Sequence, residues 1–210
     1  MNGPRGEPEA PDSGSGLGLL RRFRLYARNP RDAFSITSSE ERRQDARIAF
    51  VLYFVVKTPV LVQRAAALKR FDKLDLASQV LGVGLGLLCG MLASLVLLAV
   101  VGALLHWLVN VVLGARGSAA EARRLPALCL APQLILVAEF PSLVLDFHGY
   151  GTFLTFLMLR LVADVLSARM FYWGLRSLFG LSPRAALTIT VLPIVVLLLL
   201  FLPYILAPLR

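Results

Sequence analysis

Charged side chains interrupt the most apolar stretches of this 210-residue chain. The stretch "FLMLRLVADVLSARMFYW" carries Arg160, Asp164 and Arg169. Two other apolar stretches carry Lys57 and Glu139. An ionised side chain at the middle of a bilayer costs roughly 2.5–3.5 kcal/mol on insertion scales, so such groups normally face one another or a water-filled cavity. Two kinds of chemistry fit these residue types: a path for protons or a charged substrate, or ion pairs that hold helices in register.

The spacing of these charges brings four of them to a similar depth. Glu139 and Arg160 lie about ten residues to either side of Gly149, the centre of the loop between two apolar segments. Asp164 follows Arg160 by one helical turn on the same face, and Lys57 lies about ten residues into the first apolar segment. We therefore predict an intramembrane charge cluster of these four side chains.

The charge balance of the cluster favours the structural interpretation. Two positive charges, Lys57 and Arg160, accompany two negative ones, Glu139 and Asp164. Pairing with a cation lowers the pKa of an acid and keeps it ionised, whereas a proton relay needs an acid that can be protonated. A relay through Glu139 and Asp164 stays open as the alternative.

Residues for enzymatic catalysis or metal binding are sparse. The two histidines, His106 and His148, belong to no His-Glu-x-x-His zinc motif, and there is no Gly-x-Ser-x-Gly elbow or phosphate-binding glycine loop. Ser142, Asp146 and His148 are triad residue types, but they crowd within about seven positions of one loop. We expect no enzyme activity, no metal site and no cofactor.

The composition predicts what must hold these side chains in place. Hydrophobic residues make up 57% of the chain and charged residues 17%, which is typical of a polytopic membrane protein. The net charge of +9 is read as an orientation signal. No basic patch interleaved with aromatic residues accompanies it, so we expect no nucleic-acid partner.

Five apolar segments predict an all-α fold, a polytopic membrane helical bundle with five transmembrane helices. They are Ile48–Gln63, Val80–Val112, Leu125–Leu145, Thr152–Leu175 and Ala185–Leu206. The first is short, and the second exceeds the thickness of a bilayer core and is predicted to be one tilted helix rather than a hairpin. The predicted layout is a disordered tail at 1–16, a basic cytoplasmic or interfacial segment at 17–46, and the five-helix transmembrane domain at 47–210.

Loop charges predict an N-in, C-out orientation. The loops that would share the cytoplasmic side with the N-terminus contain several arginines, whereas the outer loop "DFHGYG" contains no Lys or Arg. The segment between Arg64 and Asp75 is a basic exception on the outer side. The predicted location is the bacterial inner (cytoplasmic) membrane, with the N-terminus in the cytoplasm.

The basic segment before the first span has an amphipathic pattern. Apolar residues recur at helical spacing in "LGLLRRFRLYARNPRDAF", and arginines occupy much of the other face: Arg21, Arg22, Arg24 and Arg28. Two interpretations stay open. These arginines bind anionic membrane lipids from an interfacial helix, or the segment is a solvated linker that keeps the N-terminus in the cytoplasm.

Small residues recur every fourth position in the second apolar segment. They are Gly82, Gly86, Gly90 and Ser94. Such a row forms one face on which another helix can pack at close range. We predict a helix-packing face whose partner is in this chain, in a second copy or in another protein.

Three stretches resemble the Yip family of small membrane proteins, in its bacterial branch. They are "NPRDAFSI", "LPALCLAPQLILVAEFPSL" and "WGLRSLFGLSPRAALTITVLP", and the resemblance extends from about Asn29 to Leu206. It implies an all-helical integral membrane protein without enzymatic activity. Eukaryotic members resemble adaptors for Rab-type GTPases, but the chain lacks an Asp-Leu-Tyr-Gly-Pro element, so GTPase binding is not carried over. Bacterial relatives are similar to membrane accessory proteins, some associated with ABC-type exporters.

Two function classes follow. In the first, the protein is an adaptor or accessory subunit that binds another integral membrane protein, such as an ABC transporter subunit, or a second copy of itself. In the second, it is a small proton-coupled transporter that uses Glu139, Arg160 and Asp164. A weaker third possibility is a lipid-organising protein that shapes the membrane.

Overall fold

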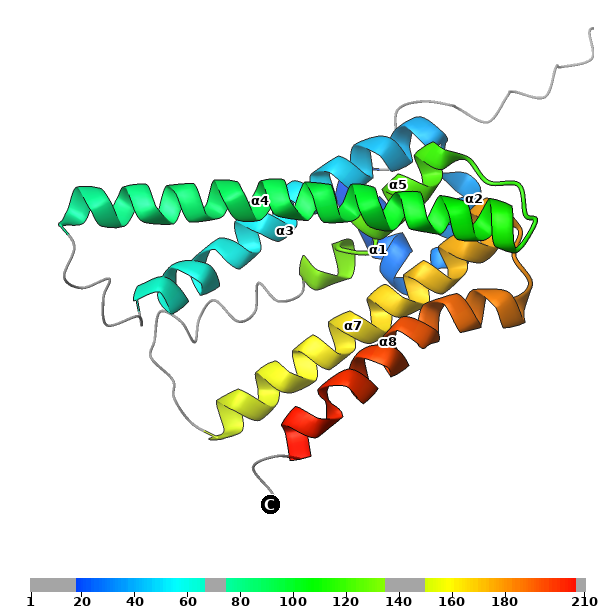
Figure 1. The fold of residues 1–210 in the computed structure, drawn as a ribbon. Coiled ribbons are helices and arrows are strands. Elements are labelled where there is room, and N and C mark those ends of the chain that lie inside the picture. Colours follow the sequence, from blue (N-terminus) through cyan, green and yellow to red (C-terminus); the bar gives the residue numbers. More distant parts are fainter. Residues whose placement is uncertain (1–17, 67–74, 135–149, 207–210) are drawn as a thin grey trace, which may run out of the picture.

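The computed structural model describes residues 18–66, 75–134 and 150–206, and every regular element within those ranges is helical (Figure 1). The elements are α1 (Leu19–Arg28), α2 (Pro30–Ile36), α3 (Ser39–Ala66), α4 (Leu76–Trp107), the π-helix η2 (Leu108–Val112), α5 (Ala119–Leu128), α7 (Tyr150–Phe179) and α8 (Pro183–Leu206). The predicted all-helical class is therefore confirmed for the described residues.

Local sequence sets the ends of the first helices. Pro30 opens α2, where its missing N–H is not needed and its fixed φ suits a helix. The Ser38 amide donates to the Glu41 carboxylate at 2.8 Å, and the Glu41 amide donates to the Ser38 hydroxyl at 3.2 Å. This reciprocal capping box starts α3. Because α3 then runs unbroken to Ala66, the predicted boundary between residues 46 and 47 lies inside one helix.

The longest apolar helix is α4 with its continuation η2. Together they form a span of 36 residues, Ala77–Val112, which is about 54 Å long at about 1.5 Å per residue. Within the described residues this is the one helix that is long and apolar enough to cross a membrane. The prediction of a single long helix here is confirmed. The other four spans, and hence the five-span topology, stay predictions.

The predicted third span, Leu125–Leu145, begins differently in the structure. Leu125 and Leu128 are fully buried at the end of α5, a helix of 10 residues capped by Ser118. After Leu128 the chain leaves the α-helix in a turn, because Pro132 has no N–H to donate and disfavours helix in the residue before it. Most of the remaining span lies outside the described residues.

The last two long helices, α7 and α8, lie side by side (Figure 1). The turn between them contains Gly180 at φ +64°, a left-handed conformation that glycine adopts without a steric penalty. The predicted fourth and fifth spans fall within these two helices.

The buried core lies at one end of the molecule, which we call the collar: residues 19–47, 102–128 and 170–186. Its largest fully buried apolar side chains are Tyr26, Leu125, Leu128, Met170 and Leu175. The long helices extend away from the collar (Figure 1). The start of α3, the end of α4 and the α7–α8 turn meet there, as loop charges predict for one side of a membrane. Whether that side is cytoplasmic stays a prediction.

Candidate functional site

A buried ion pair joins α1 to α3 in the collar. Arg22 is 6% exposed and Asp45 0%. Arg22 Nε lies 3.0 and 2.9 Å from the two Asp45 carboxylate oxygens, and its Nη2 donates at 2.7 Å. Glu41 adds a second carboxylate at 3.8 Å from Arg22 Nη1. Removing one partner of such a pair leaves an uncompensated buried charge, so the pair fixes the position of α1 on α3.

A second polar network joins α2, α3 and α5. Arg42 Nη2 donates to Glu121 at 2.9 Å, and Arg42 also donates to the backbone oxygen of Thr37. Arg124 Nη1 donates to the Ser39 hydroxyl at 2.7 Å and lies 3.5 Å from Glu121. The single acid of α5 therefore sits between two arginines from different helices and orients α5 against the start of α3.

Aromatic side chains of α1 and α2 pack together beside α7. The Tyr26 hydroxyl donates to Thr37 at 3.2 Å, and the rings of Tyr26 and Phe34 have centroids 5.3 Å apart. Burial raises the pKa of Tyr26 to about 12, so its hydroxyl stays protonated at ordinary pH. A Cβ on Gly174 of α7 would lie 2.2 Å from Leu125 and 3.2 Å from Phe34. Three helices therefore meet at Gly174, where a larger residue would have to displace the Leu125 side chain.

The four arginines of α1 that were predicted to face lipid differ in their exposure to solvent. Arg21, Arg24 and Arg28 are exposed. Arg22 corrects the prediction: it is buried on the same face as Tyr26, one helical turn away, because Asp45 offers it a carboxylate inside the collar. Lipid contact by the other three stays a prediction.

The small-residue face of α4 is open over its described glycines. A Cβ placed on Gly86 or Gly90 would meet no atom within 4 Å, and Ser94 donates back to the Gly90 carbonyl at 2.8 Å. Gly82, the first member of the predicted face, is exposed. By contrast, a Cβ on Gly102 would lie 2.7 Å from the Cα of Arg123. Close helix approach within the described chain therefore occurs at Gly102, a position outside the predicted face.

The predicted charge cluster is described only in part. Glu139 lies outside the described residues. The Asp164 carboxylate accepts a hydrogen bond from Gln133 Nε2 at 2.8 Å, and no cation lies within ion-pair distance of it in the described part of the chain. The Lys57 ammonium lies 5.7 Å from the centroid of the Tyr53 ring. The proposed pairing across the cluster therefore stays a prediction, and Gln133 is a polar partner that the sequence interpretation did not identify.

Sequence reasoning missed the collar networks of Arg22, Arg42, Asp45 and Glu121. One signal was available: Asp45 and Glu121 each stand among basic residues, "ERRQDAR" and "EARR". An acid in such surroundings often pairs locally, but nothing in the sequence indicates which distant helix supplies the partner.

Comparison with known proteins gives one family. The sequence model of the Yip1 domain matches residues 23–205, which is most of the chain. No curated protein matches, and no solved structure matches.

Proposed function

The chain belongs to the Yip1 domain family, and from this premise we propose that it is a non-enzymatic membrane protein that serves as an adaptor or accessory subunit. Its partner would be another integral membrane protein. An ABC-type exporter is the first candidate, since the resemblance to bacterial Yip proteins implies that kind of partner. A bacterial inner membrane, with the collar in the cytoplasm, is part of the same proposal.

The observation that carries this proposal is the open face of α4. Only 6% of its most apolar stretch is buried within the described residues, and Gly86 and Gly90 have no neighbour within 4 Å of an added Cβ. Glycine inside a helix costs roughly 1 kcal/mol relative to alanine. Glycines four residues apart lower the barrier to close packing by another helix. A partner helix would give these glycines a role that the described chain does not.

The test compares two leucine substitutions on the same helix. Gly86→Leu adds bulk to the small-residue face, and Gly84→Leu adds the same bulk on the far side of α4. Neither added Cβ meets an atom within 4 Å in the described chain, so both variants should accumulate. Affinity purification in a mild detergent, followed by mass spectrometry, should recover a membrane partner with wild type and Gly84→Leu and lose it with Gly86→Leu.

Either of two results would contradict the adaptor proposal. One is recovery of the chain alone, or only with copies of itself, at native expression level. The other is equal partner recovery with Gly86→Leu and Gly84→Leu, which would show that the small-residue face of α4 does not bind the partner.

One observation favours a small proton-coupled transporter as the second candidate. Within the described residues, Asp164 is exposed on α7 and is hydrogen-bonded to the uncharged amide of Gln133 rather than to a cation. For this candidate, Asp164→Asn should abolish proton-coupled uptake in reconstituted vesicles while folded protein accumulates normally. Unchanged association with a membrane partner in Asp164→Asn would support the adaptor instead.

A further inference from the structure

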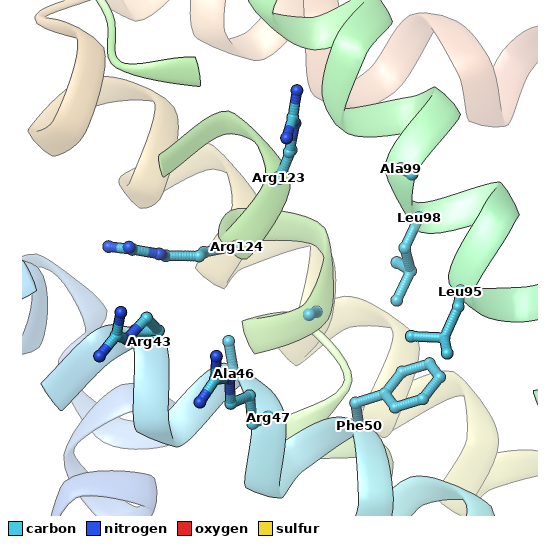
Figure 2. Close-up of a pocket in the computed structure, with 10 residues that line it drawn as sticks. Arg43, Ala46, Arg47, Phe50, Leu95, Leu98, Ala99, Arg123 and Arg124 are labelled. Carbon is cyan, nitrogen blue, oxygen red and sulfur yellow. The ribbon is translucent and has the colours of Figure 1, made fainter. Parts of the chain in front are cut away.

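A cleft of about 270 Å³ opens between α3, α4 and α5 (Figure 2). Its lining combines four arginines with a mostly apolar wall: Arg43, Arg47, Arg123 and Arg124, with Phe50, Leu95 and Leu98 among the apolar residues. Figure 2 shows Arg43 and Arg124 toward one end of the cleft and the three apolar side chains together at the other. The cleft therefore has a cationic end and an apolar end.

Two of the four arginines have capacity for a ligand. Arg43 pairs with Glu40, and Arg124 donates to Ser39. Arg47 and Arg123 are exposed, and neither has a hydrogen bond or ion pair within residues 18–66, 75–134 and 150–206. The excess of arginine over acid at the cleft favours a ligand with net negative charge.

The packing of α4 on α5 sets the position of Arg123. A Cβ on Gly102 would lie 2.7 Å from the Arg123 Cα and 2.9 Å from its Cγ. Arg123 lines the cleft from α5, and Figure 2 shows its side chain directed away from Arg47. Among the described residues, Arg47 on α3 is therefore the arginine without a partner that can face a ligand at the cationic end.

A second apolar groove lies further along the same pair of helices, α3 and α4. It has a volume of about 320 Å³ and is lined from α3 by Val51, Phe54, Val55 and Thr58, and from α4 by Leu87, Leu88 and Met91. Phe54 and Thr58 follow Phe50 at four-residue steps, and Met91 precedes Leu95 by the same step, so the two grooves share one face of each helix. From Arg47 to Thr58 the helix rises about 16 Å, close to the ~15 Å of one leaflet of hydrocarbon.

We propose that the cleft and this second groove together bind one anionic glycerophospholipid, with its phosphate at Arg47 and one acyl chain between α3 and α4. The Arg47 guanidinium supplies charge-assisted hydrogen bonds to the phosphate oxygens. The apolar wall supplies a path for the chain away from the headgroup. A free phosphate ion would use only the cationic end and leave the groove empty, so the two sources of phosphate are distinguishable.

The experiment is native mass spectrometry of the full chain in a nonionic detergent, titrated with phosphatidylglycerol or phosphatidylcholine. The wild type should retain one phosphatidylglycerol in preference to phosphatidylcholine. Arg47→Gln should bind it about fivefold more weakly, the effect expected of one basic residue near an anionic headgroup. Arg116→Gln removes an exposed arginine elsewhere in the collar and should bind as the wild type does.

A second pair of variants tests whether an acyl chain occupies the groove. Ala99 lines the cleft, and Ala99→Trp should fill it and reduce lipid retention with every arginine intact. Leu97, which is 62% exposed on α4 and does not line either groove, gives the control Leu97→Trp, which should retain lipid.

Four results would overturn the proposal. The first needs no variant: equal retention of phosphatidylglycerol and phosphatidylcholine by the wild type. The second is equal lipid binding by Arg47→Gln and Arg116→Gln. The third is release of the lipid by inorganic phosphate beyond that caused by chloride at the same ionic strength. The fourth is unchanged retention in Ala99→Trp, and either of these last two would indicate a simple phosphate site.

Discussion

The collar and α4 bury their side chains in opposite ways. In the collar, charged groups such as Arg22, Asp45 and Glu121 are nearly inaccessible and lie against carboxylate or guanidinium partners. Along α4, large apolar side chains such as Leu81 and Val96 are 66% and 63% exposed. The polar groups of the collar have partners within the chain, whereas the described residues leave most of α4 uncovered.

This difference predicts which substitutions should change the stability of the protein and which should change what it binds. Substitutions in the collar should change the free energy of unfolding, because its polar groups have partners within the chain. Substitutions on the open face of α4 should leave unfolding nearly unchanged and alter what binds there. Three tests of this difference follow, from the largest expected effect to the smallest.

Asp45→Ala should produce the largest loss of stability. It leaves Arg22 buried without its bidentate partner, and breaking a buried pair in this way costs about 3–5 kcal/mol. Denaturant unfolding of the detergent-solubilised protein measures the loss. The control is Glu40→Gln, which removes the exposed Glu40–Arg43 pair and should cost less than about 1 kcal/mol. Equal effects of the two substitutions would show that the collar pair does not hold α1 in place.

A pair of glycine-to-alanine substitutions gives an intermediate effect. Gly174→Ala places a methyl group 2.2 Å from the Cδ1 of Leu125, so the fully buried Leu125 side chain must shift and we expect a loss of about 1–3 kcal/mol. Gly86→Ala meets open space and should be neutral or stabilising by up to about 1 kcal/mol, since alanine favours helix. Thermal unfolding of both variants measures the contrast, and destabilisation by Gly86→Ala would mean that α4 is covered within the chain.

Sequence patterns predicted the long helices but only part of the collar. The run from Val80 to Val112 had no polar break, so hydropathy alone predicted one helix. Arg22 was assigned with the other arginines to a lipid-facing surface because the pattern within α1 contains no acid. Its partner, Asp45, is 23 residues away on another helix. Pairing of this kind depends on tertiary packing, which the periodicity of one segment does not encode.

The arginine cleft illustrates the same limit. Arg47 directly precedes the first predicted span and Arg123 lies two residues before the third, and hydropathy relates each of them only to its neighbours in the sequence. They line one cleft because α5 ends early and turns back against α3 and α4. The short length of α5 depends on Pro132, but its docking depends on Gly102 and Glu121, whose contacts become evident only in the fold.

The smallest expected effect is a pH dependence at the start of α3. The hydrogen bond from the Ser38 amide lowers the pKa of Glu41 below its ordinary value. A lowered folded-state pKa means that the ionised cap stabilises the fold above the unfolded value near about 4.3, and that this contribution disappears as the pH falls through the folded value. Because Glu41 is largely solvated, we expect only about 0.3 kcal/mol.

Unfolding of the wild type and Glu41→Gln at neutral pH and below about pH 4 measures this dependence. The difference between the two proteins should vanish in acid. A difference that persists unchanged would assign the role of Glu41 to packing rather than charge. The difference in stability between the wild type and an α4 variant, in which Glu41 is kept, should not change with pH.

The clamp at the C-terminal end of α4 makes this helix a lever. Asn110 accepts a hydrogen bond from the Gly117 amide at 2.8 Å and donates to the Gly117 carbonyl at 3.2 Å, which locks η2 to the segment leading into α5. The far end of the helix lies about 50 Å from this pivot. A tilt of about 5° at the pivot would sweep that end through about 4 Å, a shift typical of domain hinges. A molecule that grips the distant half of α4 would therefore exert torque on the collar with a large mechanical advantage.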